Sequence, residues 1–286
     1  MLATIAKGVR AAGRAANHAV YRMAPFADET ATFADVCGSR QVLFFSPHQD
    51  DEVITMGAGI AELSLGNPGN DNVVVLCSDG SKSAVRGRLG GEDTCDWHEG
   101  THCHELDEAE FTAARDGEFR RSCEALGIKP GNVEIADPRA VDGDLDQAFA
   151  DEVVARYVAR HPDAVVCTIA PGPMSGKGDG QAQHPDHIRL GRAALKLFEQ
   201  GTIKDLFFFV EPYCVEFMRR NAKENRLSRL EPSPAGAEMV ETAVGAYRDW
   251  DPEQGSFGVG YHSVRGEIDR FLCDTTAYFY PQRRRA

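Results

Sequence analysis

Two short polar stretches contain the residue types that bind metal ions and move protons. The first stretch is PHQDDE at 47–52, and the second is QHPDH at 183–187. Each follows a run of apolar residues and precedes a helix-like segment. A helix cap accounts for one aspartate in each stretch, but it leaves the histidines and the second aspartate of 47–52 unexplained. This density of histidine and carboxylate side chains therefore indicates a metal site.

The residue types also indicate which chemistry such a site would perform. Two histidines and one carboxylate make a three-ligand set, and a catalytic zinc ion with three protein ligands keeps a position open for water. The metal lowers the pKa of that water to about 7 and polarises a carbonyl group. Asp50 and Asp51 are adjacent, so one can bind the metal while the other accepts a proton. A histidine beside a carboxylate, as His184 is beside Asp186, suits oxyanion stabilisation or protonation of a leaving group.

The rest of the chain alternates between strand-like and helix-like segments. Apolar runs predict buried strands at 41–46, 72–77, 164–169 and 206–210, with a weaker strand at 133–135. Helical periodicity predicts helices at 52–65, 108–126, 145–159 and 185–199. Strands that are apolar throughout, with helices between them, are typical of a parallel sheet covered on both faces. We therefore expect an α/β fold with a Rossmann-like, mostly parallel sheet and helices on both faces.

This fold explains why two distant stretches would form one site. Each stretch follows the C-terminal end of a predicted strand, 41–46 for the first and 164–169 for the second. In open α/β sheets, ligands bind outside the carboxyl ends of the strands, where the strand order reverses. If these two strands are neighbours at that point, 47–52 and 183–187 meet in one crevice.

Segment lengths and composition predict three parts of the chain. We expect an N-terminal helical extension at 1–37, an α/β catalytic domain at 38–215 and a C-terminal segment at 216–286 that packs on that domain. Two long loops, about 79–107 and about 170–183, are expected to be functional.

Charge and cysteine content limit the partners and the location. The chain has 44 acidic and 31 basic residues, and a net charge of -13 argues against nucleic acid as a partner. No run of about 18 apolar residues exists, so no membrane span is expected. The eight cysteines are dispersed, which favours free thiols and a cytoplasmic location. The sequence leaves open whether the chain forms a homo-oligomer.

The two stretches together resemble a known family. Pro-His-x-Asp-Asp-Glu after a first strand and His-Pro-Asp-His after a later one are similar to the motifs of the PIG-L/LmbE-like zinc-dependent de-N-acetylases. The resemblance covers about 40–200, including the helix at 112–127 with its Ala-Leu-Gly ending at 125–127. Where the family usually has proline after the first histidine, this chain has Gln49. That position holds no ligand in the family, so we expect little effect on the chemistry.

The resemblance implies a role for each motif residue. It implies that zinc is bound by His48, Asp51 and His187. It also implies that Asp50 is the general base and that His184, oriented by Asp186, stabilises the tetrahedral intermediate.

Four further residues are candidates for substrate binding. Asp79 stands where the family has substrate contacts, although an ordinary Asp-Gly turn explains it equally well. Arg115 is expected to contact a sugar hydroxyl or a phosphate, with a surface salt bridge as the alternative. Trp97 lies in a Cys/His-rich loop at 95–104, which we interpret as a lid whose tryptophan stacks on a sugar ring. That loop fits no familiar ligand spacing, so a second, structural zinc there is the less favoured reading. His262 resembles a His-Ser element near the family's C-terminus.

The leading hypothesis is therefore a zinc-dependent hydrolase that removes an acetyl group from an N-acetylated amino sugar, an N-acetylglucosamine-type conjugate. One alternative is an iron(II)-dependent oxygenase with a His48, Asp50 and His187 triad, although the usual fold of those enzymes is all-β. Another alternative is a non-catalytic, metal-stabilised sugar-binding protein.

Overall fold

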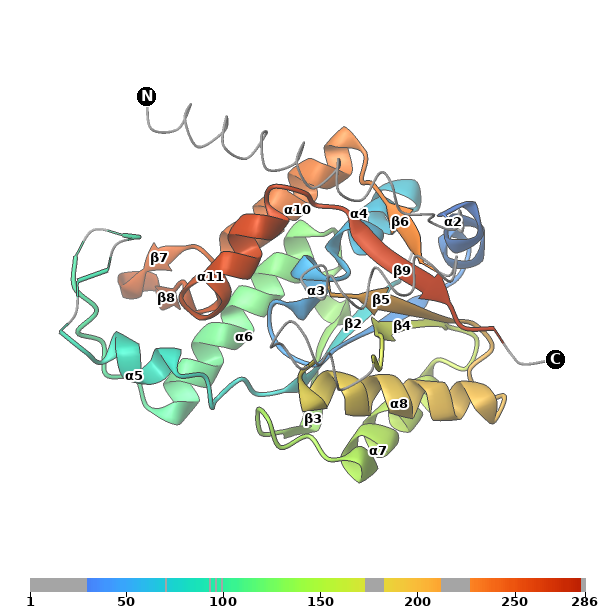
Figure 1. Ribbon diagram of the computed structural model, residues 1–286, viewed down its shortest axis with the longest axis horizontal. Coiled ribbons are helices and arrows are strands. Elements are labelled where there is room, and N and C mark those ends of the chain that lie inside the picture. The colour runs from blue at the N-terminus through green and yellow to red at the C-terminus, as the bar shows by residue number, and fades with distance from the viewer. Residues whose placement is uncertain are drawn as a thin grey trace.

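The computed structural model describes residues 30–69, 71–92, 94, 95, 97, 98, 100–172, 183–211 and 227–283. These residues build a seven-stranded sheet between two layers of helices (Figure 1), which confirms the predicted α/β class. Residues 1–29 of the helical extension predicted at 1–37 lie outside the described residues.

The sheet has the strand order β3-β2-β1-β4-β5-β9-β6. Its strands are β1 (Val42–Ser46), β2 (Val73–Ser78), β3 (Val133–Ala140), β4 (Val165–Ile169), β5 (Leu206–Val210), β6 (Ser228–Leu230) and β9 (Ala277–Pro281). The pairs from β3 to β5 are parallel, whereas β9 runs antiparallel to both β5 and β6. Strands β1 and β4 are neighbours and the strand order reverses between them, which is the condition under which the two polar stretches would meet.

The helices follow the expected alternation with additions near the C-terminus. They are α2 (Thr30–Gly38), α3 (Asp51–Ile54), α4 (Gly57–Gly66), α5 (Val85–Leu89), α6 (Glu108–Ala125), α7 (Gln147–Arg160), α8 (Pro185–Glu199), α10 (Pro234–Ala246) and α11 (Val259–Phe271). A small ribbon of β7 (Trp250–Asp251) and β8 (Ser256–Phe257) lies between α10 and α11. Local signals fix several helix ends. A capping box between Asp107 and Glu110 begins α6, and Gly127 follows its end with a positive φ of 84°.

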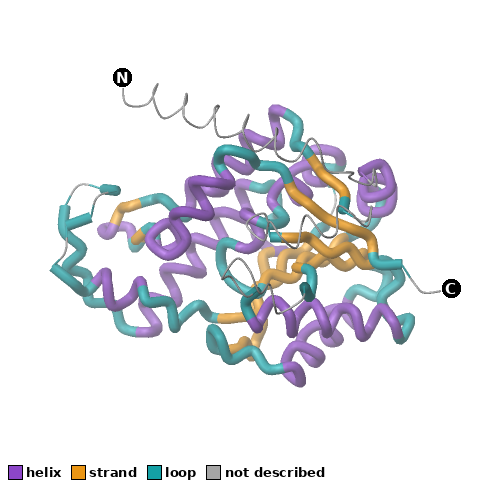
Figure 2. The backbone as a smooth tube through the Cα atoms, viewed as in Figure 1, coloured by secondary structure: helices purple, strands orange, loops and turns teal. Residues whose placement is uncertain are grey.

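Alternate residues of each strand enter two hydrophobic cores. On β1, Leu43 and Phe45 belong to the core under α7 and α8, whereas Val42 and Phe44 belong to the core under α4, α6 and α10. Figure 2 shows the strands between these helical layers. Burial on both faces explains why the strands are apolar throughout rather than alternating.

Two of the predicted elements differ in their extent. The helix expected at 52–65 is interrupted after Ile54, and its first turn, α3, is separate from α4. The strand expected at 133–135 extends to Ala140 as β3, with a register shift beside Ser78. The residues added to β3 include Asp137 and Pro138, so no apolar run marks them in the sequence.

The C-terminal part of the chain contributes to the same sheet. Strand β9 lies against β5, and Phe279 faces Phe209 across that pair. The predicted boundary at 215 falls in 212–226, outside the described residues, so the division into 38–215 and 216–286 stays a prediction.

Candidate active site

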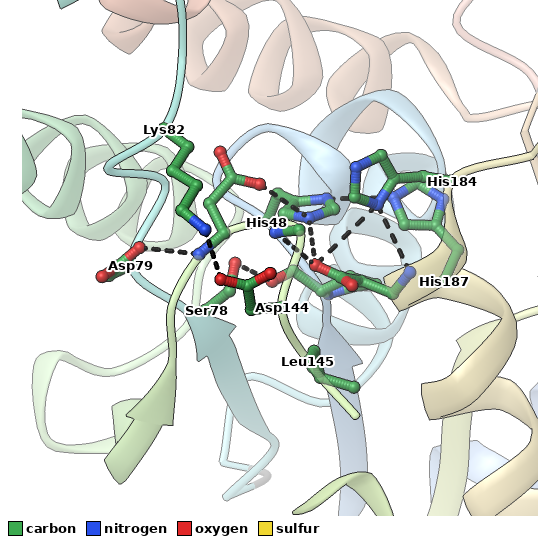
Figure 3. A network of polar contacts seen from close by, with 12 residues as sticks. His48, Ser78, Asp79, Lys82, Asp144, Leu145, His184 and His187 are labelled. Carbon is green, nitrogen blue, oxygen red and sulfur yellow. Dashed lines mark hydrogen bonds and ion pairs between the residues drawn. The ribbon is translucent and has the colours of Figure 1, made fainter. Parts of the chain in front are cut away.

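The two polar stretches meet beyond the carboxyl ends of β1 and β4. Phe45 of β1 is paired with Thr168 of β4, so the chain leaves both strands at the same edge of the sheet. Figure 3 shows the rings of His48, His184 and His187 gathered there. The centroids of the His48 and His187 rings are 5.1 Å apart. The topology therefore converts two distant motifs into one cluster.

Three donor atoms of this cluster converge as metal ligands do. His48 Nδ1 lies 3.1 Å from His187 Nε2 and 3.3 Å from Asp51 Oδ2, and Asp51 Oδ2 lies 3.0 Å from His187 Nε2. Ligands about 2.0–2.2 Å from a tetrahedral zinc ion would be separated by roughly 3.3–3.5 Å. The spacing among His48, Asp51 and His187 thus comes close to a three-ligand zinc set, with all three atoms facing one point.

The outer nitrogens of both rings meet carboxylates. His187 Nδ1 lies 2.8 Å from Glu211 Oε1, and His48 Nε2 lies 3.1 Å from Asp186 Oδ2. An ionised carboxylate only accepts hydrogen bonds, so these outer nitrogens carry the protons. With a metal ion beside Asp51, the inner nitrogens would present lone pairs to it, which is the tautomer that metal-binding histidines adopt when carboxylates support them. The donor set therefore fits a metal ion.

The pKa shifts of the same residues indicate a site that attracts positive charge. Burial alone lowers the pKa of His48, but hydrogen bonds to Asp186 and Asp51 outweigh it and raise the pKa to about 9. The pKa of His187 is likewise raised, because the effect of Asp51 and Glu211 exceeds the opposite effect of burial. Burial raises the pKa of Asp51, yet the His187 and His48 rings lower it far below the ordinary value. A cation, whether proton or metal, is stabilised at this point.

Asp50 occupies a different position from its neighbour Asp51. Its φ of 99° places it in the left-handed region, and its carboxyl group lines the cavity instead of joining the donor set. Arg115 Nη2 lies 3.6 Å from Asp50 Oδ2. Burial raises the pKa of Asp50 to about 7, although the charge of Arg115 opposes that shift. A carboxyl group with a pKa near neutrality suits proton transfer.

A buried network holds the backbone of Asp50 in this strained conformation. Its amide donates to Tyr247 Oη at 2.9 Å and to Glu52 Oε2 at 3.0 Å. Tyr247 and Ser122 both donate to Glu52 Oε1, at 2.7 and 2.6 Å. Burial raises the pKa of Glu52 to about 8, against the hydrogen bonds from Ser122 and Tyr247. The polar partners compensate for the strain at Asp50.

A cavity of about 290 Å³ opens onto the donor set. Its lining residues come from both motifs, from α6 and from α11. They are His48, Asp50, Asp51, Ile54, Ser83, Ala84, Arg115, Asp142, His184, His187, Ser263, Val264 and Glu267. The metal-ligand candidates, the candidate base and His184 therefore share one small chamber.

His184 lies at the half-exposed rim of this chamber, with 41% of its side chain accessible. It is the N-cap of α8, where its Nδ1 accepts a hydrogen bond from the Asp186 amide at 3.3 Å. Burial lowers the pKa of His184, and the nearby His48 and His187 rings add to this effect. The carboxylate of Asp186 lies 3.8 Å from His184 Nδ1, farther than the 3.1 Å to His48 Nε2. Asp186 is thus mainly a partner of His48.

The four predicted substrate-binding residues are not brought together. Arg115 lines the cavity, but Asp79, Trp97 and His262 are absent from its lining among the described residues. Asp79 Oδ1 accepts from the amides of Ser81 and Asp142, both at 2.9 Å. In Figure 3, Asp79 lies near the ion pair of Lys82 and Asp144, away from His187. Trp97 packs against His262, with ring centroids 4.9 Å apart. The substrate roles stay predictions.

Several residues of the site carry no signal in the sequence. Glu211 directly follows β5, Asp142 Oδ1 lies 3.4 Å from His48 Nε2, and Tyr247 follows α10. None belongs to either motif. Strand order could have suggested Glu211, because β5 is the next strand beyond β4. Gln49, the departure from the family pattern, is fully buried and donates to Asp79 O and Asp116 Oδ1.

Comparison with known proteins places this geometry in a family. The family model described as GlcNAc-PI de-N-acetylase (PIG-L) matches residues 43–198. A 1D-myo-inositol 2-acetamido-2-deoxy-alpha-D-glucopyranoside deacetylase from Kineococcus radiotolerans is 30% identical over an alignment of 181 positions, which covers 55% of this chain and 44% of that protein. The chain thus spans less than half the length of this curated relative.

Two solved structures resemble the chain. GalB, the 4-carboxy-2-hydroxymuconate hydratase from Pseudomonas putida KT2440, has a TM-score of 0.50 and 17% identity, covering 86% of this chain and 98% of that one. N,N'-diacetylchitobiose deacetylase from Pyrococcus horikoshii has a TM-score of 0.43 and 18% identity, covering 75% of each chain. The likeness to GalB concerns the fold alone, since one fold hosts different reactions. The family model, by contrast, covers more than half of the chain and both motifs, so the chain belongs to the PIG-L family of GlcNAc-PI de-N-acetylases.

Proposed function

We propose that this protein is a zinc-dependent hydrolase that removes an acetyl group from an N-acetylated amino sugar, in a conjugate of the N-acetylglucosamine type. One observation carries the proposal. The donor atoms of His48, Asp51 and His187 converge beside Asp50 in a single cavity. Family membership and the acetamido sugar named for the Kineococcus radiotolerans relative support the substrate class. The free thiols among the described cysteines are consistent with a reducing, cytoplasmic location.

Zinc is the proposed metal because two imidazoles with one carboxylate form a catalytic zinc set, and because de-N-acetylation, the reaction named for the family, is a hydrolysis that needs no redox-active ion. A zinc ion bound there would polarise the amide carbonyl and make water more acidic. The ion would be held by His48, Asp51 and His187, with Glu211 and Asp186 fixing the tautomers of the two rings.

The residues around the donor set would divide the proton transfers. Asp50, with a pKa of about 7, takes a proton from the attacking water, and Arg115 keeps the carboxylate in place. At a pH near 7, His184 is neutral because its pKa is lowered, mainly by burial. Since His184 Nδ1 accepts from the Asp186 amide, its proton is on Nε2. From the rim of the cavity, that N–H would donate to the oxyanion of the tetrahedral intermediate.

The geometry supports this reading over both alternatives. The oxygenase alternative takes Asp50 as its carboxylate ligand, but the carboxylate that meets the histidines belongs to Asp51. The surrounding fold is α/β and not the usual all-β fold of those enzymes. A purely sugar-binding protein would not require Asp50 and His184, and both line the cavity.

The test is acetate release from a panel of N-acetylglucosamine conjugates by the zinc-loaded protein. We expect release from at least one conjugate, loss of release after chelation and recovery with added zinc. Asp50→Asn, which keeps the shape of the side chain, serves as the inactive control. Zinc-loaded protein that releases no acetate from any conjugate, or equal release by Asp50→Asn, would contradict the proposed activity.

A further inference from the structure

A second group of metal-binding side chains lies outside the cavity lining. Cys95, His98 and His102 come from the loop between α5 and α6, and His262 comes from the first turn of α11. One donor atom from each of the four residues lies within 4.8 Å of all the others. None of the four is among the residues that line the cavity described above.

Two donor–donor distances in this group come close to those of tetrahedral zinc coordination. Cys95 Sγ lies 3.6 Å from His262 Nε2, and His102 Nε2 lies 3.2 Å from His262 Nε2. Zinc bonds of about 2.3 Å to sulfur and about 2.0–2.1 Å to nitrogen place tetrahedral ligands roughly 3.6 Å apart for a sulfur–nitrogen pair and roughly 3.3–3.4 Å apart for two nitrogens.

Hydrogen bonds to the backbone fix the tautomers of two of the histidines. His102 Nδ1 lies 3.1 Å from Arg88 O, and His262 Nδ1 lies 2.8 Å from Gly258 O. A carbonyl oxygen only accepts, so both Nδ1 atoms carry protons and both Nε2 atoms present lone pairs. These lone pairs face each other at 3.2 Å. Two acceptors at this distance repel each other unless a cation lies between them. Metal-bound histidines usually donate their other ring N–H to a backbone carbonyl or a carboxylate, as these two do.

Aromatic rings pack against the histidines of the cluster. His102 and His262 are 3% and 7% exposed. The ring of Trp250 stacks on His98, with centroids 3.6 Å apart, and Trp97 packs edge-on against His262. Cys95 and His98 are half-buried, so the cluster is partly shielded from water, which strengthens electrostatic attraction between a cation and a thiolate.

We propose that Cys95, His98, His102 and His262 bind a structural zinc ion. Four protein ligands fill a tetrahedral shell and leave no position for water, as in structural rather than catalytic sites. A thiolate with three imidazoles selects zinc over magnesium or calcium. This inference does not depend on the proposed hydrolase activity.

The ion would join the loop to the wall of the cavity. His262 is followed by Ser263 and Val264, which line the cavity, and Arg88 Nη1 donates to His262 O at 3.0 Å. The α5–α6 loop would thereby hold the start of α11 in place. Trp97 then serves as a packing residue of this cluster, rather than as a sugar-stacking residue of a lid.

The first test is the zinc content of the full chain after loading with excess zinc and desalting, measured by mass spectrometry. We expect two zinc ions per wild-type chain and one in Cys95→Ser. Cys103→Ser is the matched control, because its exposed thiol lies in the same loop outside the cluster, and it should keep both ions. His187→Ala should lose only the ion of the other site. A single zinc ion in the wild type that Cys95→Ser retains would overturn the proposal.

The second test uses cobalt(II) in the wild type, so it does not require that a variant folds. A thiolate ligand gives cobalt(II) a charge-transfer band in the near ultraviolet, and the catalytic donor set contains no sulfur. We expect this band in wild type and in Cys103→Ser, and its loss in Cys95→Ser. Wild-type protein loaded with two cobalt ions that lacks the band would exclude Cys95 as a ligand.

Discussion

At the scale of single residues, two adjacent aspartates have different environments. Asp51 Oδ2 lies within 3.3 Å of both ligand histidines, whereas Asp50 is held in the left-handed region with its carboxyl group toward Arg115. A sharp turn between a strand and a helix allows this division, since neighbouring side chains then point in different directions.

We predict that Asp50→Asn and Asp51→Asn lose activity for different reasons. Asp50→Asn cannot accept a proton, so turnover should fall by about 100- to 10,000-fold, or about 3–5 kcal/mol of barrier, with zinc retained. Asp51→Asn should weaken zinc binding itself, and excess zinc should partly restore its acetate release. Metal content and acetate release measured on the same samples separate the two. If Asp50→Asn lost the metal while Asp51→Asn kept metal and rate, the assigned roles would be reversed.

Tyr247 contributes to the same site without entering the cavity. We predict that Tyr247→Phe lowers the free energy of unfolding by about 1–3 kcal/mol, because the amide of Asp50 and a carboxylate oxygen of Glu52 lose a buried partner. Turnover should fall because Asp50 loses one of its two backbone anchors, while zinc content stays unchanged. Urea denaturation, acetate release and metal analysis measure the three quantities.

Tyr261→Phe provides the control, since the Tyr261 hydroxyl donates to the exposed Asp269 at 2.8 Å. It should cost about 1 kcal/mol or less, with turnover unchanged. Equal losses of stability and turnover in the two variants would argue against a positioning role for Tyr247.

At the scale of elements, the close approach of α8 to β4 positions His184 and His187. Gly191 lies one turn after His187, and a Cβ atom there would come within 2.6 Å of Ile169 O and 2.9 Å of Pro171. The strand end and the helix can be this close only because residue 191 has no side chain. Pro185 at the first turn and His184 as N-cap begin the helix at the motif itself.

We predict that Gly191→Ala destabilises the protein by about 1–3 kcal/mol, because a backbone oxygen cannot move away as a flexible side chain would. Gly245→Ala in α10 is the control, since a Cβ atom there meets nothing within 4 Å. It should leave stability unchanged or raise it by about 0.5–1 kcal/mol. Thermal or urea unfolding compares the two variants, and a Gly191→Ala protein as stable as wild type would show that α8 can shift.

At the scale of the whole molecule, the C-terminal segment completes the sheet and the site. Strand β9 covers the edge of β5, whose Phe207 and Phe209 are buried with Phe279. The same segment supplies Tyr247 to the Asp50 network and residues of α11 to the cavity. No helix of the described residues is long and apolar enough to cross a membrane.

We predict that a chain ending at residue 211 does not fold cooperatively, because the edge of β5 and the hydrophobic core under α10 would be exposed. Near-ultraviolet circular dichroism and binding of a hydrophobic dye should reveal a loss of fixed packing. A control chain ending at residue 283 should unfold as the full chain does. Cooperative unfolding of 1–211 would instead support an independent domain close to the predicted 38–215.

The sequence by itself determined the elements and the two motifs. Continuous apolar runs identified four of the five parallel strands, since strands buried on both faces have no polar side, whereas β3 was predicted only as a weaker strand at 133–135. The glycine at 127 marked the end of the helix predicted at 108–126, because a helix stop acts within one turn. The position of each motif after a strand predicted a shared site, and His48, Asp51 and His187 do converge.

Only the tertiary structure decided which distant residues complete each cluster. Glu211 behind His187 and Tyr247 behind Asp50 come from parts of the chain that carry no motif, and His262, which the sequence offered as a substrate-binding candidate, lies beside Cys95. For the same reason, the loop at 95–104 showed no familiar ligand spacing when it was considered alone. Local periodicity encodes helices and strands. The fourth donor of the proposed zinc site, His262, reaches the other three only because α11 packs against that loop. The spacing of residues along the chain does not show which surfaces will be in contact.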